Sequence, residues 1–267
     1  MQDNRPEDQD VLNALPNGAK LSWGLNKPPT RGPKGELSIP KIVEAAIAIA
    51  DKDGLAAVSM SRVAGSLGFT TMSLYRYISS KDDLLYLMQD AVCNIQIPDV
   101  AEESMDWREN LRTFVRACMQ VFRDHPWYID IPIMGIPLAP YNLKVIDWAL
   151  RSMRQLPLNH FEKMSFILLL SSYSRSGGML LRDIDRAVEA GSSVASFSGV
   201  NYGSALQMLV KPEQYPDLYP VIASGAYTGE NEQDNNVGDD FEFGLERILD
   251  SIEHYLTIKE LNQSGSK

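Results

Sequence analysis

The chain has 267 residues, of which 44% are hydrophobic and 22% charged, a balance typical of globular proteins that excludes wholesale disorder. Its longest apolar run, around Phe166 to Leu170, is far too short to cross a bilayer, so no membrane association is expected. The net charge of −10 argues against nucleic-acid binding, unless basic residues are concentrated in one part of the chain.

Residues 1–37 are rich in proline, glycine and asparagine, and this composition predicts a flexible arm without packed structure. Its last part, KPPTRGPKG, places Lys27, Arg31 and Lys34 just before the first predicted helix of the next region. A basic arm at this position can enter the minor groove of DNA, or it can serve only as a linker. The sequence leaves both interpretations open.

The next segment, residues 38–97, has the spacing of a helix-turn-helix domain. A first helix is expected from about Ser38 to Gly54. The run VSMSRVAGSLGFTTMSLYRYISSKDDLL then predicts two short helices joined at Gly68, a residue that tolerates the positive φ of a tight turn. Ser59 and Thr70 are expected to cap these two helices.

The second short helix, predicted over Thr71 to Ile78, has the composition of a recognition helix. Leu74 and Ile78 are expected to face inward, which leaves hydroxyl groups, aromatic rings and an arginine on the outer faces. Such a surface suits the major groove of DNA. Ser80, followed three residues later by Asp83, then predicts a capping box at the start of a helix over Lys81 to Ile95.

Charge is distributed in agreement with this interpretation. Between Lys27 and Lys81 there are eight basic and four acidic residues, so this segment carries +4 and the rest of the chain −14. A basic head on an acidic body can bind phosphates while the body is repelled from them.

Residues 98–267 are predicted to be helical as well, and we expect an all-α protein with no strand. The helical period covers residues 106–125, 142–156, 159–190, 202–210 and 241–261. Proline limits residues 127–140 to one short helix, and most of residues 191–240 is expected to be irregular, including an acidic stretch at 229–240.

The predicted helix over residues 159–190 is apolar on all sides in its middle, FILLLSSY, and is expected to lie at the centre of its domain. Within it, Gly177 and Gly178 mark either a close approach by another backbone or a ligand, or a kink. The apolar stripe of the last helix, Phe241 to Leu261, can either form half of a dimer interface or pack on its own subunit.

Methionine and aromatic side chains are numerous in this second region, and they can line an apolar pocket or simply form its core. The candidate effector-binding residues are Trp107, Phe114, Trp127, Met134, Trp148, Met153, Phe166, Tyr173 and Met179.

These motifs together resemble the TetR/AcrR family of bacterial transcriptional regulators. The most specific part is Leu-Tyr-Arg-Tyr followed by Ser-Lys-Asp-Asp-Leu-Leu, within the run from Ile42 to Met88. A weaker resemblance covers Asp106 to Asp185, in DWRENLRTFVRACMQVFRDHPWYIDI, APYNLKVIDWALRSMRQL and LLLSSYSRSGGMLL. It implies a TetR-type helical domain with a ligand cavity, in a homodimer joined by the last two long helices of each subunit.

By this resemblance the recognition helix enters the major groove and the lysine that follows it contacts a phosphate. The candidate DNA-binding residues, with two from the arm, are Arg31, Lys34, Ser61, Arg62, Thr70, Thr71, Met72, Ser73, Tyr75, Arg76, Tyr77 and Lys81.

We therefore expect a cytoplasmic, homodimeric repressor that binds an inverted-repeat operator and is released by a small hydrophobic effector. The alternative is a regulator controlled by a protein partner or by no ligand. Neither a catalytic constellation nor a phosphate loop is present, so we expect no enzyme and no cofactor. The three histidines and two cysteines, Cys93 and Cys118, have no metal-binding spacing; we expect reduced thiols, although the sequence leaves a disulfide between them open.

Overall fold

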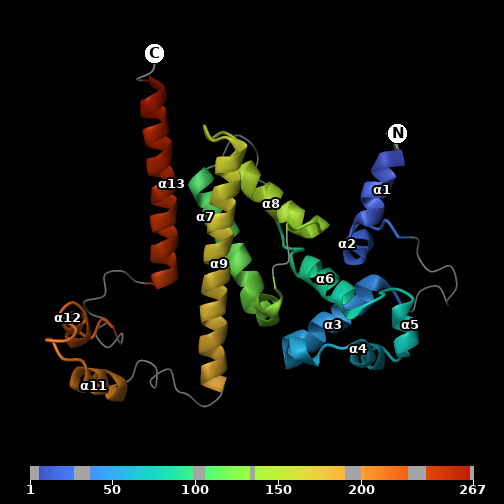
Figure 1. Cartoon of the computed structure of the whole chain (residues 1–267), viewed down its shortest axis with the longest axis horizontal. Coiled ribbons are helices and arrows are strands. Elements are labelled where there is room, and N and C mark those ends of the chain that lie inside the picture. The colour runs from blue at the N-terminus through green and yellow to red at the C-terminus, as the bar shows by residue number, and fades with distance from the viewer. Residues whose placement is uncertain are drawn as a thin grey trace. The chain divides into compact units, whose positions relative to one another are not determined.

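The computed structural model describes residues 6–26, 37–98, 106–132, 136–189, 200–227 and 239–264, and within these ranges all regular structure is helical (Figure 1). The all-α prediction is confirmed. The chain divides into two compact units, Met1–Gly178 and Met179–Lys267. None of the helices in the described ranges is long and apolar enough to span a bilayer.

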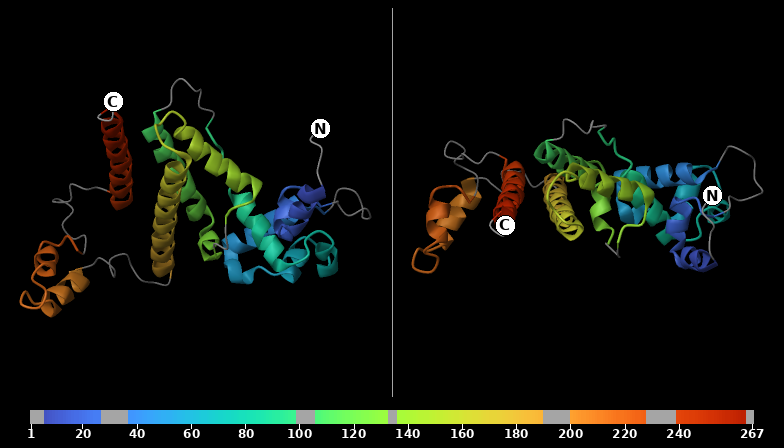
Figure 2. Two further views of the ribbon diagram at one scale, coloured as in Figure 1. Left: turned by 45° about the horizontal axis from the view of Figure 1, so that its top comes forward. Right: turned by 90° about the horizontal axis from the view of Figure 1, so that it is seen from above.

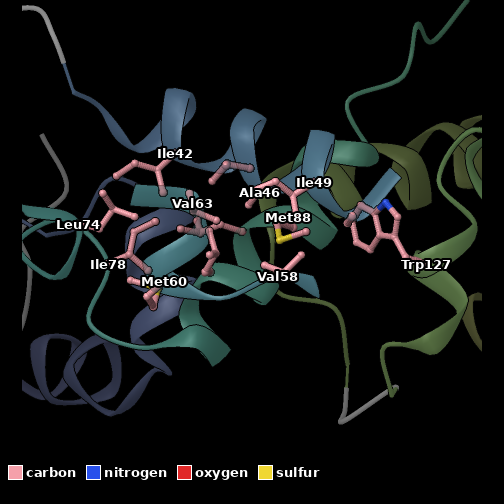
Figure 3. Packing of buried hydrophobic residues seen from close by; sticks show 14 of the residues in the cluster. Ile42, Ala46, Ile49, Val58, Met60, Val63, Leu74, Ile78, Met88 and Trp127 are labelled. Atoms are coloured by element: carbon pink, nitrogen blue, oxygen red, sulfur yellow. The ribbon is translucent and has the colours of Figure 1, made fainter. Parts of the chain in front are cut away.

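Four helices pack around one apolar core in the first unit. They are α3 (Ile39–Asp53), α4 (Met60–Ser66), α5 (Thr71–Tyr75) and α6 (Lys81–Val92). Figure 3 shows this core, to which α3 contributes Ile42 and Ile49, α4 Val63, α5 Leu74 and α6 Met88. The recognition helix ends at Tyr75, three residues earlier than expected, although Ile78 beyond it is fully buried as predicted.

Four side-chain caps fix where these helices begin, and three of them, at Ser59, Thr70 and Ser80, were predicted. The side-chain oxygens of Ser38, Ser59, Thr70 and Ser80 each accept a hydrogen bond from the backbone N–H three residues further on. A cap of this kind stabilises a helix by about 1 kcal/mol, a large contribution for helices as short as α4 and α5. Gly68 has φ +75° in the turn between them, as expected.

The expectation of an arm without packed structure is wrong for residues 6–22. Helices α1 (Pro6–Ala14) and α2 (Asn17–Ser22) form there, and α2 lies beside α6 (Figures 1 and 2). Proline does not oppose them, because Pro6 and Pro16 stand at helix starts, where the missing N–H has no intrahelical acceptor. The basic residues Lys27, Arg31 and Lys34 lie outside the described residues.

The rest of the first unit is built from α7 (Trp107–Asp124), the 3-10 helix η3 (Pro126–Asp130), α8 (Pro140–Ser152) and most of α9 (His160–Glu189). Asp106 caps α7 by accepting a hydrogen bond from the backbone N–H of Arg108 at 2.9 Å. Helices α7 and α8 pack on each other, and α8 also packs on α6.

Helix α9 passes very close to α7 at Gly178. A Cβ atom at Gly178 would lie 2.5 Å from the Cβ of Phe122, a separation that side-chain atoms do not adopt. The glycine pair therefore does mark a close approach, but the approaching group is the Phe122 side chain and not the backbone or ligand that was expected.

The expectation that α9 is buried on all sides is wrong. Phe161 is 87% exposed and Leu168 is 69% exposed, whereas Ile167 and Leu170 on the opposite face are buried. The sequence could not separate the two faces, because both carry apolar residues.

The second unit contains the end of α9, α11 (Val200–Leu209), α12 (Leu218–Ala223) and α13 (Asp240–Ser264). Helix α12 was not predicted. Along α13, Leu245, Leu249 and Ile252 are fully buried within the single chain, whereas Tyr255 and Ile258 are exposed. The stripe of α13 is thus largely covered without a second subunit. Most of the acidic stretch at 229–240 lies outside the described residues.

Candidate nucleic-acid interface

The outer side of α5 presents the side chains that the sequence predicted for base contacts. Met72 is 71% exposed and Tyr75 44% exposed, and Arg76 is also exposed at the C-terminal end of the helix. Leu74 between them is fully buried and holds the helix on the core. The helix can therefore present one ring, one thioether and one guanidinium to a ligand without unfolding.

The remaining candidates on α5 or beside it either cap the helix or are partly buried. Thr70 accepts a hydrogen bond from the backbone N–H of Ser73 at 3.3 Å, and the two hydroxyl oxygens are 2.9 Å apart. Thr71, Ser73 and Tyr77 are half-buried. Thr70 thus fixes the start of the helix, and Ser73 remains partly accessible beside it.

Helix α4 and the start of α6 add positive charge and hydroxyl groups to this side of the fold. Ser61 and Arg62 are exposed in the first turn of α4, and Lys81 is exposed as the first residue of α6. Arg62 forms an ion pair with Asp53, at the end of α3. A phosphate contact by Arg62 therefore has to compete with Asp53.

This geometry has counterparts among known proteins. Residues 42–86 match the description "Bacterial regulatory proteins, tetR family", and residues 98–256 match "Tetracyclin repressor-like, C-terminal domain". The chain belongs to the TetR family. It is accordingly a helix-turn-helix transcriptional regulator that binds DNA, and not an enzyme.

Individual relatives agree with this assignment. The HTH-type transcriptional repressor DrrR1 of Streptomyces coeruleorubidus is 32% identical over 241 residues, which cover 88% of this chain and 84% of the relative. The apo form of ActR from Streptomyces coelicolor has a TM-score of 0.66 at 23% identity, covering 85% of this chain and 100% of ActR. ActR in complex with actinorhodin has a TM-score of 0.65 at 24% identity, covering 80% and 94%.

The DNA-binding head of this TetR-family regulator shares its core with the segment that follows α7. Trp127 of η3 is 2% exposed and belongs to the same apolar cluster as Ile49 and Met88 (Figure 3). Its indole N–H donates to the Oδ1 of Asp51 in α3 at 2.5 Å, and the Nδ1 of His125 is 2.8 Å from the same oxygen. The head is therefore held by η3 as well as by the covalent connection through α6.

A polar cluster holds the other end of α6. The Asp90 Oδ1 accepts hydrogen bonds from the backbone N–H groups of Tyr141, at 2.8 Å, and Asn142, at 3.2 Å, at the start of α8. The Asn142 side chain donates to the Cys93 sulfur at 3.3 Å and to the Tyr128 hydroxyl at 3.4 Å. Burial raises the pKa of Asp90, which is 4% exposed, although these backbone N–H groups oppose that rise.

Neither cysteine is an activated thiol. Burial raises the pKa of Cys93 to about 11 and that of Cys118 to about 12. Both are free thiols in this structure. Burial also raises the pKa of Tyr128, whose hydroxyl lies 3.5 Å from the Cys93 sulfur. No group of three or more histidine, cysteine, aspartate and glutamate residues with metal-binding geometry occurs within the described ranges.

The structure brings together some of the effector-binding candidates and separates others. Phe114 of α7 and Trp148 of α8 meet edge to face with ring centroids 5.7 Å apart, and both are buried, as is Met153. Trp127 instead lies in the core of the DNA-binding head. The remaining candidates are Trp107, Phe166 and Tyr173, which are half-buried, Met179, which is 42% exposed in the second unit, and Met134, which lies outside the described residues.

Two positions of importance were not identified from the sequence. Asp51 holds η3, but its bond to Trp127 joins residues 76 apart in the chain and has no local signal. Asn17 donates to the Asp83 carboxylate, so the acidic member of the predicted capping box bonds to α2. The contact between Asn17 and Asp83 was not expected, because the composition of the N-terminal segment predicted a flexible arm.

Proposed function

We propose that this TetR-family regulator is a homodimeric repressor that binds an inverted-repeat operator and is released by a small hydrophobic effector. The exposed Met72, Tyr75 and Arg76 on a capped recognition helix are the observation that carries the proposal. The similarity to DrrR1, which is named a transcriptional repressor, supports repression as the direction of control.

Two observations support dimerisation: the recognition helix is short, and one face of α9 exposes apolar side chains. A helix of five residues reads only a few base pairs, so a unique site requires two copies related by a two-fold axis. Phe161, Met164 and Leu168 are spaced at three and four residues and lie exposed on one face of α9. A second copy that covered this face would remove a contiguous apolar patch from water.

The effector proposal is supported by two buried donors on α8. The Nε1 of Trp148 and the Nε of Arg151 are buried and have no hydrogen-bond partner within the described part of the chain. An unsatisfied buried N–H costs about 1–3 kcal/mol, which a ligand oxygen can recover. An effector with an aromatic body for Phe114 and Trp148 and with carbonyl or hydroxyl oxygens suits this region. ActR, solved in complex with actinorhodin and with (S)-DNPA, supports small-molecule control in this fold.

Release of DNA requires that the effector bind the non-DNA conformation more tightly. Two connections could transmit the difference to the head. One is α6, anchored to α8 through Asp90, and the other is η3, anchored to α3 through Asp51. A coupling free energy of about 1–3 kcal/mol would weaken operator binding about 5- to 150-fold.

The test is a fluorescence-anisotropy titration of the full chain against DNA flanking its own gene, at two salt concentrations and with a panel of aromatic compounds. Arg76→Ala should abolish specific binding and leave the oligomeric state unchanged. Lys81→Ala should weaken binding to all sequences alike and lower the salt slope by about one, because a phosphate contact carries no base information. Specific binding that no compound disturbs would favour a regulator controlled by a protein partner or by no ligand. Specific binding that survives both Arg76→Ala and Tyr75→Ala would show that α5 is not the helix that reads the operator.

A further inference from the structure

The short helix α2 is packed against α6 too closely for a side chain to separate them. Gly18 and Ala19 of α2 are buried, and Ala19 has no exposed surface. A Cβ atom built on Gly18 would lie 2.8 Å from the Cβ of Tyr86 on α6. The two helices are therefore in direct backbone-to-ring contact.

Hydrogen bonds fasten both ends of α2 to parts of the fold that are distant in sequence. At its start, the Asn17 side chain donates to the Asp83 Oδ2 at 3.0 Å, in the first turn of α6. Just beyond its end, the Trp23 indole N–H donates to the carbonyl of Leu138 at 2.7 Å, two residues before α8. Asn26 in turn donates to the Asn17 Oδ1 at 3.0 Å and orients that amide.

These contacts complete a three-sided frame of α2, α6 and α8. Asp83, Tyr86 and Asp90 are spaced at three and four residues and so share one face of α6. Asp83 binds α2, Tyr86 packs on Gly18, and Asp90 binds the first backbone N–H groups of α8. Trp23 then connects α2 to the segment before α8. Helix α2 thus contacts both α6 and the segment before α8, and these contacts restrict the angle between α6 and α8.

We infer that α2 is a brace that positions the DNA-binding head, with Asn17, Gly18 and Trp23 as positioning residues for operator binding. The inference rests on the proposed operator-binding function. Only five residues separate the end of the recognition helix from the start of α6, so a change in the direction of α6 moves α5 with it. Without α2, two heads in a dimer sample more separations, and fewer of these match successive grooves.

Two variants loosen the brace without touching the DNA-binding surface. Trp23→Phe removes the indole N–H and leaves an aromatic ring at a side chain that is 50% exposed. Gly18→Ala inserts a methyl group between α2 and the Tyr86 ring. Val11→Ala, at an exposed residue of α1, is the control. We expect both brace variants to weaken specific operator binding at least about fivefold, with unchanged binding to random DNA and an unchanged dimer.

A double-mutant cycle separates positioning from a merely structural role. Asn17→Asp places two carboxylates together and should weaken specific binding. Combining it with Asp83→Asn exchanges the donor and the acceptor and should restore affinity to that of Asp83→Asn alone. A cycle without coupling between these two positions would overturn the brace.

Hydrogen exchange of the free protein tests the same inference without DNA. The amides of Tyr141 and Asn142, which donate to Asp90, should exchange faster in Trp23→Phe and Gly18→Ala, and no faster in Val11→Ala. Faster exchange confined to α2 would contradict the brace. If the wild-type chain bound no inverted repeat, the operator proposal would fail, and exchange at Tyr141 and Asn142 would still decide the brace.

Discussion

In the free protein, Arg62 forms an ion pair with Asp53. We predict that this pair limits how strongly Arg62 can bind a DNA phosphate. Both side chains are partly exposed, at 48% and 34%, so the pair is worth at most about 1 kcal/mol. Asp53→Asn should release the guanidinium for a phosphate and raise DNA affinity, by no more than about fivefold. Anisotropy titrations at low and high salt measure the change, which should shrink as salt screens it.

The control for this variant is Glu44→Gln, which removes one negative charge from the same helix without touching Arg62. Equal gains from both variants would show that lowering the net negative charge is sufficient. A gain from Asp53→Asn alone would place Arg62 at the DNA backbone.

At the scale of elements, the close approach of α9 to α7 predicts that a side chain at Gly178 lowers the free energy of unfolding. Gly178→Ala would set a methyl group against Phe122, and overpacking of this kind costs about 1–3 kcal/mol. Gly65→Ala in α4 is the matched control, because a Cβ there has no neighbour within 4 Å. Alanine favours a helix interior over glycine by about 1 kcal/mol, so the control should be more stable than the wild type.

Urea denaturation followed by circular dichroism measures both variants. Both variants gain helix propensity, so a free energy of unfolding that falls in Gly178→Ala but not in Gly65→Ala reports the contact with Phe122. Equal stabilisation of both would mean that α7 and α9 can separate at little cost.

The helices of the DNA-binding head were predictable because their signals are local. Ser59, Thr70 and Ser80 cap the helices that the sequence assigned to them, and Gly68 adopts the left-handed conformation that its turn requires. Helix α2 was missed because its stability comes from α6, to which it is bound across more than 60 residues. Amino-acid composition can indicate that a segment is flexible, but it does not show whether a distant part of the fold binds that segment.

The candidate effector site was less predictable for the same reason. An aromatic residue at helical spacing is compatible with a pocket wall and with a core, and only tertiary contacts separate the two. Trp127 thus turned out to belong to the core of the head, whereas Phe114 and Trp148 meet between α7 and α8. The unsatisfied Trp148 N–H, which distinguishes that region, has no signature in the sequence.

At the scale of the whole molecule, the proposed dimer makes operator binding depend on a face that never touches DNA. Leu168→Glu would place a carboxylate on the exposed apolar face of α9, where a second copy would have to desolvate it. We expect a monomer by analytical ultracentrifugation at micromolar concentration and unchanged helicity, because Leu168 is 69% exposed in the single chain. Specific operator affinity should fall by more than 100-fold, since each head would then bind its half-site independently.

The control is Val11→Glu, at a residue of α1 that is 67% exposed. It makes the same change in charge away from α9, so this variant should remain dimeric. A Leu168→Glu protein that stayed dimeric and bound the operator normally would exclude this face of α9 from the interface.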